Sequence, residues 1–171
     1  RGGKKVWWND VYVLEKEADG KPNWFTSTRL ELLKPSAYGV AISTEKGLLC
    51  IGGCDAERCH EDVFRLQWLP AERELKLQRL PNLPRPLAFM AGAMVDDVVY
   101  LMGGQEKMGG DATNNFWSLD LSKPSAELAW KELPPWSGPP RILPLAASQS
   151  NGENDCLYLF SGRNPHSEKA T

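Results

Sequence analysis

One pattern recurs along the chain at a spacing of about fifty residues. The segment Val98–Gly104 is a short apolar run that ends in two glycines, and a polar loop separates it from the aromatic-containing run Asn114–Asp120. The same order is found at Leu48–Gly53 and Glu61–Gln67, and Cys156–Gly162 repeats its first half with serine in place of the first glycine. A repeat of this length restricts the fold to architectures built from successive similar units.

This repeat is typical of a kelch-type β-propeller, in which each unit folds as one four-stranded blade. We therefore predict an all-β fold without helices. Its strands are expected at 5–15, 24–30, 36–44, 48–53, 61–67, 73–79, 87–95, 98–104, 114–121, 127–133, 144–150 and 156–162. Grouped by blade, these strands give an outer half-blade in 1–34, complete blades in 35–80 and 81–134, and an inner half-blade in 135–171.

The predicted strands amount to about three blades' worth of a propeller, whereas such rings close with about four to eight blades. Three blades alone would leave unpaired strand edges at both ends. We therefore expect this to be a partial chain that belongs to a larger ring. The remaining blades are expected in the same polypeptide, and the alternative is that a second chain completes the circle.

The double glycines and the tryptophans have structural explanations. Glycine accepts a positive φ and lets backbones approach closely, so each glycine pair marks a blade and does not form a phosphate-binding loop. Trp24, Trp117 and Trp130 are interpreted as packing residues between blades. Trp7 and Trp8 are adjacent in a predicted strand, so they point to opposite faces and one of them is expected to be exposed.

Composition and charge exclude some classes of partner. The chain has 171 residues and a formal net charge of −2, without a basic run, so a nucleic acid is not expected as a partner. No apolar stretch approaches the roughly 18 residues needed to span a bilayer, so we expect no membrane insertion.

The cysteines and histidines give no clear catalytic or metal-binding set. Cys50 and Cys156 fall within predicted strands and are expected to be buried. Cys54 and Cys59 flank a short loop with His60 directly after it; a zinc site and a disulfide are both considered, and no fourth zinc ligand is evident. We predict neither a metal nor a cofactor.

Strand topology predicts a binding face at one end of the blades. The link that enters each innermost strand and the loop between the second and third strands emerge on the same side of an up-and-down blade. Charged residues on that side are candidates for binding a carboxylate through paired hydrogen bonds, and their alternative role is in surface salt bridges between blades. The substrate-binding candidates are Arg85, Arg141, Glu106 and Arg163, and Asp55, Glu57, Arg58, Gln105, Lys107 and Asn164 are expected beside them.

Several segments resemble a known family. Gly3–Tyr12, Ser36–Ala41 and Leu48–Gly53 are similar to segments of bacterial N-acetylneuraminate epimerases, which are sialic acid mutarotases. In the common form of that family these segments lie near the C-terminus. Here they precede Pro86–Phe89 and Arg141–Ile142, which resemble its opening blades, so the chain is similar to the cyclically permuted branch.

The resemblance implies a six-bladed propeller in the periplasm that interconverts the α and β anomers of N-acetylneuraminate, a small acidic sugar, and it allows a homodimer. In that family the catalytic carboxylate and arginine lie in a blade that this chain does not match. The catalytic residues are therefore unknown here. Ser36 stands where relatives carry an arginine, so this blade is not expected to hold the sugar carboxylate. The alternative function is a non-catalytic kelch module that binds a protein or a glycan.

Overall fold

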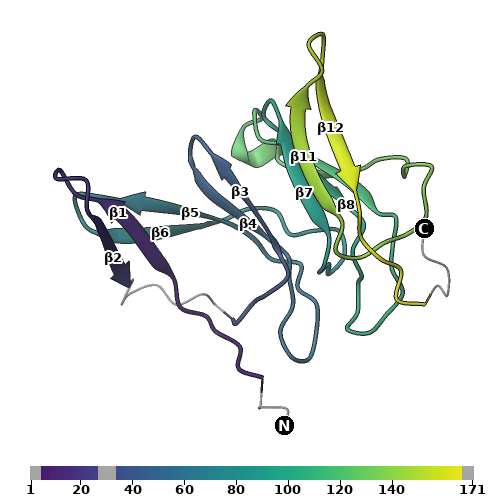
Figure 1. Ribbon diagram of the computed structural model, residues 1–171, viewed down its shortest axis with the longest axis horizontal. Helices are drawn as coiled ribbons and strands as arrows, with labels where there is room; N and C mark the ends of the chain where they lie inside the picture. Colours follow the sequence, from purple (N-terminus) through teal and green to yellow (C-terminus); the bar gives the residue numbers. More distant parts are fainter. Residues whose placement is uncertain (1–4, 27–33, 167–171) are drawn as a thin grey trace.

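The structure is a computed structural model that describes residues 5–26 and 34–166, and it is built almost entirely of β-strands (Figure 1). Its strands are β1 (Tyr12–Lys16), β2 (Pro22–Thr26), β3 (Val40–Thr44), β4 (Gly47–Ile51), β5 (Val63–Leu69), β6 (Glu74–Arg79), β7 (Ala91–Val95), β8 (Val98–Met102), β9 (Phe116–Asp120), β10 (Trp130–Glu132), β11 (Leu145–Ser150) and β12 (Asp155–Phe160). The predicted all-β class is therefore confirmed. Part of the second predicted strand, 24–30, lies outside the described residues.

The strands form two complete blades and two hairpins. One four-stranded sheet has the order β3-β4-β5-β6 and the other has the order β7-β8-β9-β10, and all neighbouring strands are antiparallel. The pairs β1–β2 and β11–β12 form separate two-stranded sheets. This up-and-down order within each sheet is the arrangement of β-propeller blades.

The sheets lie side by side as successive sectors (Figure 1). The innermost strands β3 and β7 contact each other, and β7 also contacts β11. At the outer edge, the β1–β2 hairpin packs beside the first complete blade, where Trp68 Nε1 donates a hydrogen bond to Glu15 Oε1 at 3.3 Å. Phe25 contacts the same tryptophan, with ring centroids 5.9 Å apart. Within the described residues the sectors do not close into a ring.

The innermost strands begin later than the sequence predicts. Tyr38, Phe89 and Leu143 each have a positive φ, of 58°, 59° and 53°, directly before β3, β7 and β11. The chain therefore turns sharply at this position in each sector, and only an isolated bridge such as Ala37 to Cys54 precedes the turn. The left-handed backbone is unusual for residues other than glycine, and propensity alone does not predict it.

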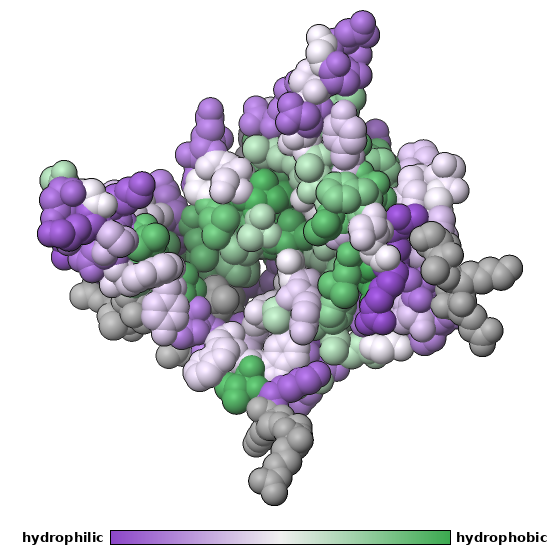
Figure 2. All heavy atoms as spheres, viewed as in Figure 1, coloured by the Kyte–Doolittle hydropathy of each residue, from purple (hydrophilic) through white to green (hydrophobic). Residues whose placement is uncertain are grey.

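The main core lies between the two complete blades. Trp117 and Leu119 of β9, Leu49 of β4, Leu101 of β8 and the connecting residue Leu87 are fully or almost fully buried there. On the face drawn in Figure 2, hydrophobic residues gather across the middle of the molecule and hydrophilic residues lie at the outer tips. Burial of this apolar surface, at about 25 cal/mol per Å², holds one blade against the next.

The small residues of the innermost strands allow a close approach. A Cβ atom on Gly92 of β7 would lie 2.7 Å from Cγ1 of Val40 on β3, so a side chain at this position would push the two strands apart. Bulky residues therefore do not fit at this position between the innermost strands.

The tryptophan predictions hold for four of the five residues. Trp117 is buried, and Trp130 packs against the core and donates its Nε1 hydrogen to the carbonyl of Pro81 at 3.0 Å. Trp8 is 70% exposed whereas Trp7 is partly buried, as expected of the pair, although neither lies in a strand. The packing interpretation of Trp24 is wrong, because this side chain is 64% exposed. Strand alternation turns the next residue of β2 toward the blade instead.

The only helical segment among residues 5–26 and 34–166 is a single 3-10 turn at Ser125–Glu127, which follows Pro124. Proline fixes φ near the value that such a turn needs at its start, which explains a turn where only strands and loops were expected. No helix in the described part of the chain has the length and apolar character needed to cross a membrane.

Candidate functional site

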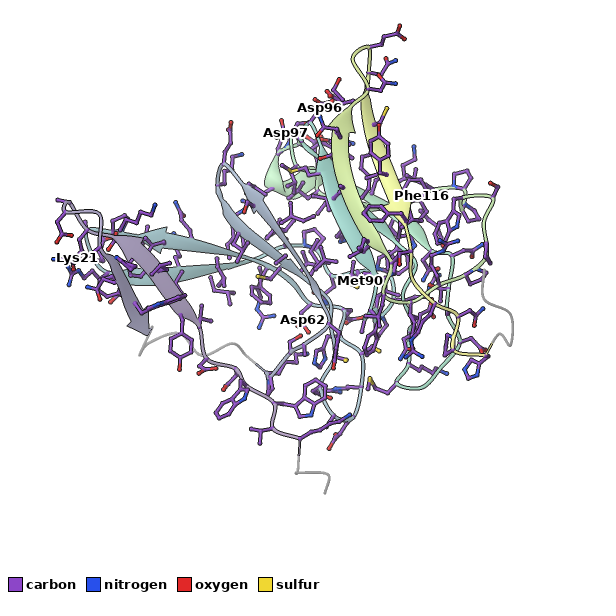
Figure 3. All side chains as sticks on the ribbon, viewed as in Figure 1. Lys21, Asp62, Met90, Asp96, Asp97 and Phe116 are labelled. Carbon is purple, nitrogen blue, oxygen red and sulfur yellow. The ribbon has the colours of Figure 1, made fainter. Side chains whose placement is uncertain are left out.

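The long connections gather at one end of the blades. Figure 3 shows Asp62 and Met90 toward this end, and Asp96 and Asp97 in the short turn between β7 and β8 at the other end. The loops between second and third strands therefore share a face with the links into the innermost strands. We call this end the loop face, and it is the face on which the sequence predicts ligand binding.

The double glycines join consecutive blades on the loop face. The amide of Gly53 donates a hydrogen bond to the carbonyl of Leu87 at 2.9 Å, and a Cβ atom on Gly52 would lie 2.5 Å from the same oxygen. Both glycines have a positive φ, of 58° and 97°. Ser161 keeps this left-handed backbone, with φ 62°, where serine replaces the first glycine. The structural interpretation of the glycine pairs is therefore confirmed.

A cleft of about 500 Å³ opens on the loop face between the two complete blades. One wall is the loop that follows β4, and the other is formed by the link into β7 and the loop that follows β8. Its lining residues are Glu57, Arg58, Cys59, Arg85, Pro86, Glu106, Lys107 and Met108. Three cationic side chains and two carboxylates line the cleft, and a third carboxylate, Glu132, binds Arg85 at its edge.

Arg85 is held by a network of hydrogen bonds at the edge of the cleft. Its Nε donates to Glu106 Oε1 at 2.8 Å, and its Nη2 donates to Glu132 Oε1 at 3.0 Å and to Asn115 Oδ1 at 3.2 Å. The guanidinium carbon also lies 5.2 Å from the ring centroid of Trp117. Because the hydrogen bonds that Arg85 donates to Glu132 and Glu106 stabilise its charged form, they raise the pKa of Arg85. Arg85 thus already has carboxylate partners from its own blade.

Arg58 is presented to the cleft by a tight turn. Asp55 Oδ1 accepts hydrogen bonds from the amides of Glu57 at 2.8 Å and Arg58 at 2.9 Å, which orders the backbone of this loop. These two backbone hydrogen bonds lower the pKa of Asp55. Within the described part of the chain, neither Arg58 nor Lys107 has a carboxylate within salt-bridge distance. These two cations can therefore take an anionic ligand without breaking an existing pair.

The structure does not bring Arg141 and Arg163 into this cleft. Arg141 lies one blade further along, where its Nη1 donates to the carbonyl of Ser161 at 3.1 Å and its guanidinium lies 5.9 Å from the ring centroid of Trp136. The backbone of Arg163 pairs with Ile142, and its side chain is exposed. Both residues are on the loop face, but they belong to the next sector.

Two further candidates, Gln105 and Asn164, also belong to different sectors. Gln105 is buried, with 5% of its surface exposed, and its backbone pairs with Ala88. Asn164 lies in the sector of Arg163, where its Oδ1 accepts a hydrogen bond from the amide of His166 at 3.1 Å. Neither side chain lines the cleft.

The four cysteines are free thiols in two environments. Cys54 and Cys59 are buried and pack together with Ala88. Cys50 and Cys156 are only partly buried, so the expectation that both are buried is wrong. Among residues 5–26 and 34–166, no three His, Cys, Asp or Glu side chains are grouped so that they could hold a metal ion.

Sequence reasoning missed the residues that position Arg85. Asn115 and Glu132 precede β9 and end β10, and they reach Arg85 only because the blade folds back on itself. No local pattern marks them, although the repeat itself offers a signal. Asp62 occupies the place of Asn115 in the preceding blade, where its carboxylate binds Lys34 Nζ at 2.6 Å.

Sequence comparison finds relatives over about half of the chain. An N-acetylneuraminate epimerase of Pasteurella multocida (strain Pm70) is 38% identical over 82 residues, which are 48% of this chain and 18% of that protein. N-acetylneuraminate epimerases of Haemophilus influenzae strains PittEE and 86-028NP are each 38% identical over 85 residues, or 50% of this chain and 20% of each relative. The match thus spans about a fifth of these relatives. No protein-family model matches the chain.

Solved structures share the fold. A fungal alcohol oxidase of the AA5 family, in complex with copper, has a TM-score of 0.60 at 15% identity and covers 82% of this chain and 30% of its own. The structure of YjhT has a TM-score of 0.56 at 15% identity and covers 84% of this chain and 54% of its own. Together with the blade topology, these likenesses establish kelch-type β-propeller blades. In sequence, the chain is similar to the bacterial N-acetylneuraminate epimerases, as its segments predicted.

Proposed function

We propose that the chain is part of an N-acetylneuraminate epimerase that interconverts the α and β anomers of this acidic sugar. The observation that carries the proposal is the 38% identity to three proteins with that name, over about half of the chain. The cations that line the cleft on the loop face give independent support, because an acidic sugar needs positive charge at its binding site.

Interconversion of the anomers requires the sugar ring to open and close again. A base removes the proton from the anomeric hydroxyl, the bond to the ring oxygen breaks, and an acid delivers a proton to that oxygen. Closure on the other face of the resulting carbonyl gives the other anomer. No residue of the described chain is assigned to these proton transfers, because the carboxylates in the cleft are engaged with Arg85 or exposed at its rim.

The proposed role of this cleft is to hold the carboxylate of the sugar. Arg58 and Lys107 are the cations available for charge-assisted hydrogen bonds, and each such bond is worth about 1.5–3 kcal/mol. Arg85 contributes positive charge at the same edge, but Glu106 and Glu132 fix its guanidinium. Arg141 and Arg163 lie in the next sector, outside this cleft.

The proposal extends to the complete protein. We propose a six-bladed ring that acts in the periplasm on a small acidic sugar in carbohydrate metabolism, without a cofactor, and we place the blade boundaries after residues 34, 80 and 134. In such a ring each double glycine joins one blade to the next, as Gly53 does here. A homodimer of complete rings is compatible with this arrangement.

A proton NMR time course tests the function. The complete gene product is mixed with freshly dissolved α-anomer, and the appearance of the β-anomer is followed against the spontaneous rate. Acceleration in proportion to protein concentration supports the proposal. Binding of the sugar without acceleration would contradict the proposal and favour the alternative function, a non-catalytic kelch module that binds a glycan.

A further inference from the structure

The loop that forms one wall of the cleft is a short hairpin with a cysteine on each side of its base. Cys54 and Cys59 face each other as an antiparallel pair. The amide of Asp55 donates to the carbonyl of Arg58 at 3.0 Å, and the amide of His60 donates to the carbonyl of Gly53 at 2.7 Å. These two hydrogen bonds flank the cysteine pair, and the cysteines themselves exchange none.

This hydrogen-bond pattern defines a non-hydrogen-bonded pair, which is the closer of the two antiparallel pair types. Its Cα atoms are about 4.5 Å apart, and its side chains point to the same side of the ladder. A disulfide requires Cα atoms about 4.4 to 6.8 Å apart. The backbone around Cys54 and Cys59 therefore satisfies the requirement for a disulfide without having to move.

The surroundings of the two thiols are consistent with this geometry. Cys54 is completely buried and Cys59 is 5% exposed, and the two side chains belong to one apolar cluster with Ala88. Further hydrogen bonds fix Cys54, whose amide and carbonyl both pair with Ala37, at 2.8 and 2.9 Å. Cys59 lines the cleft, so it is the less deeply buried of the two cysteines.

We propose that Cys54 and Cys59 form a disulfide that closes the base of the 55–58 loop. The oxidant is a low-molecular-weight disulfide such as glutathione disulfide. The thiolate of Cys59 attacks it and releases one glutathione thiolate, and the thiolate of Cys54 then attacks the sulfur of Cys59 in the mixed disulfide and releases the second. Two cysteine thiols are oxidised, one glutathione disulfide is reduced, and the two protons pass to the two glutathione molecules.

The link fixes the base of the segment that carries Glu57 and Arg58 to the cleft. In the reduced chain that base is held by the hydrogen bonds between Asp55 and Arg58 and between His60 and Gly53. A covalent link also restricts the unfolded chain, so the oxidised form is the more stable one. This inference rests on the hairpin geometry alone and holds whether or not the cleft binds a sialic acid.

Peptide mapping tests the proposal. The full chain is reduced, unfolded and refolded in a glutathione redox buffer, remaining thiols are blocked with N-ethylmaleimide, and the product is digested with trypsin. Cleavage after Lys46, Arg58 and Arg65 leaves Cys54 in Gly47–Arg58 and Cys59 in Cys59–Arg65. We expect the two peptides to be joined, with the other cysteine of the first peptide, Cys50, blocked.

Two variants decide which cysteine forms the link. Cys50→Ser should keep the joined peptides and Cys54→Ser should lose them. Joined peptides that persist in Cys54→Ser, or peptides that carry only blocking groups or single glutathione adducts, would overturn the proposal. As a second readout, a reductant should lower the Tm of the oxidised chain by about 5 °C and leave the Tm of Cys54→Ser unchanged. No shift in the oxidised chain would contradict the proposed link.

Discussion

The amide of Gly104 donates a hydrogen bond to the carbonyl of Arg141 at 2.9 Å. Gly53 and Leu87 are joined in the same way at the same distance, one blade earlier. In both cases the second glycine of a pair binds the link that leads to the following blade. Arg141 is therefore the structural counterpart of Leu87 and not of Arg85.

A side chain at Gly104 should disrupt the close packing between this glycine and the link that leads into β7. Its φ is 95°, and a Cβ atom would lie 2.7 Å from the carbonyl oxygen of Ala88. We expect Gly104→Ala to lower the free energy of unfolding by about 3 kcal/mol, the combined cost of left-handed backbone and overpacking. Gly109→Ala is the control, because its φ of 68° is also positive but its surroundings are open. Chemical denaturation should show a cost of about 1 kcal/mol for this control; equal costs would contradict the packing argument.

Trp117 and Trp24 should differ strongly in their contribution to stability. Trp117 is completely buried between the blades, so Trp117→Ala should cost about 3–5 kcal/mol. Trp24 is exposed in β2, so Trp24→Ala should cost less than about 0.5 kcal/mol. Denaturant titration of both variants measures the difference. A large loss for Trp24→Ala would show that another part of the protein covers this residue.

The ion pair between Arg85 and Glu132 should make stability depend on acid pH. Hydrogen bonding to Arg85 lowers the pKa of Glu132 in the folded state. Its stabilising effect is therefore present above the ordinary carboxyl pKa of about 4.3 and is lost as the pH falls through the lower folded-state value. We expect Glu132→Gln to lower Tm at pH 7 but not at strongly acidic pH. Glu153→Gln, which removes a carboxylate without an ion pair in the described chain, is the control.

A Tm difference between wild type and Glu132→Gln that stays constant from pH 7 into the strongly acidic range would rule out this linkage. If Glu153→Gln lowered Tm at pH 7 and not at strongly acidic pH, as expected for Glu132→Gln, general charge repulsion and not the pair with Arg85 would be the cause.

Thiol labelling of the reduced, folded chain should be slow at Cys54. Burial raises the pKa of this thiol to about 11, so its thiolate fraction at pH 7 is about a hundredfold below that of an ordinary cysteine. We expect Cys156, which is partly exposed, to react first with a thiol reagent, and the rate at Cys54 to rise about tenfold per pH unit below its pKa. Labelling of Cys54 as fast as Cys156 at pH 7 would show that the hairpin opens readily.

Much of the fold follows from local sequence patterns. The glycine pairs require left-handed backbone and each follows a short apolar run at a regular spacing, so the strand order and the loop face were predictable. The orientation of Trp24 was not, because β2 has aromatic residues on both faces and only the packing of Phe25 against Trp68 selects between them. The residues around Tyr38 also do not predict its positive φ.

The candidate site was predictable only in outline. Topology placed Arg85 and Glu106 on the same face, and the structure joins them at 2.8 Å. Glu132, the other carboxylate that binds Arg85, is 47 residues away in the sequence, so this contact is seen only in the folded blade. The distinction between a cation that already has partners and one that is available, such as Arg58, depends on these long-range contacts.

The most direct test of the account is a titration of the isotope-labelled chain with N-acetylneuraminate, followed by proton–nitrogen NMR. We predict that chemical-shift changes gather at the amides of residues 57–59 and 106–108, which line the cleft. Lys107→Ala should weaken binding about tenfold, the loss of one charge-assisted hydrogen bond, whereas Lys46→Ala, in the exposed turn between β3 and β4, should not. Shift changes centred elsewhere, or equal weakening by both variants, would contradict the account.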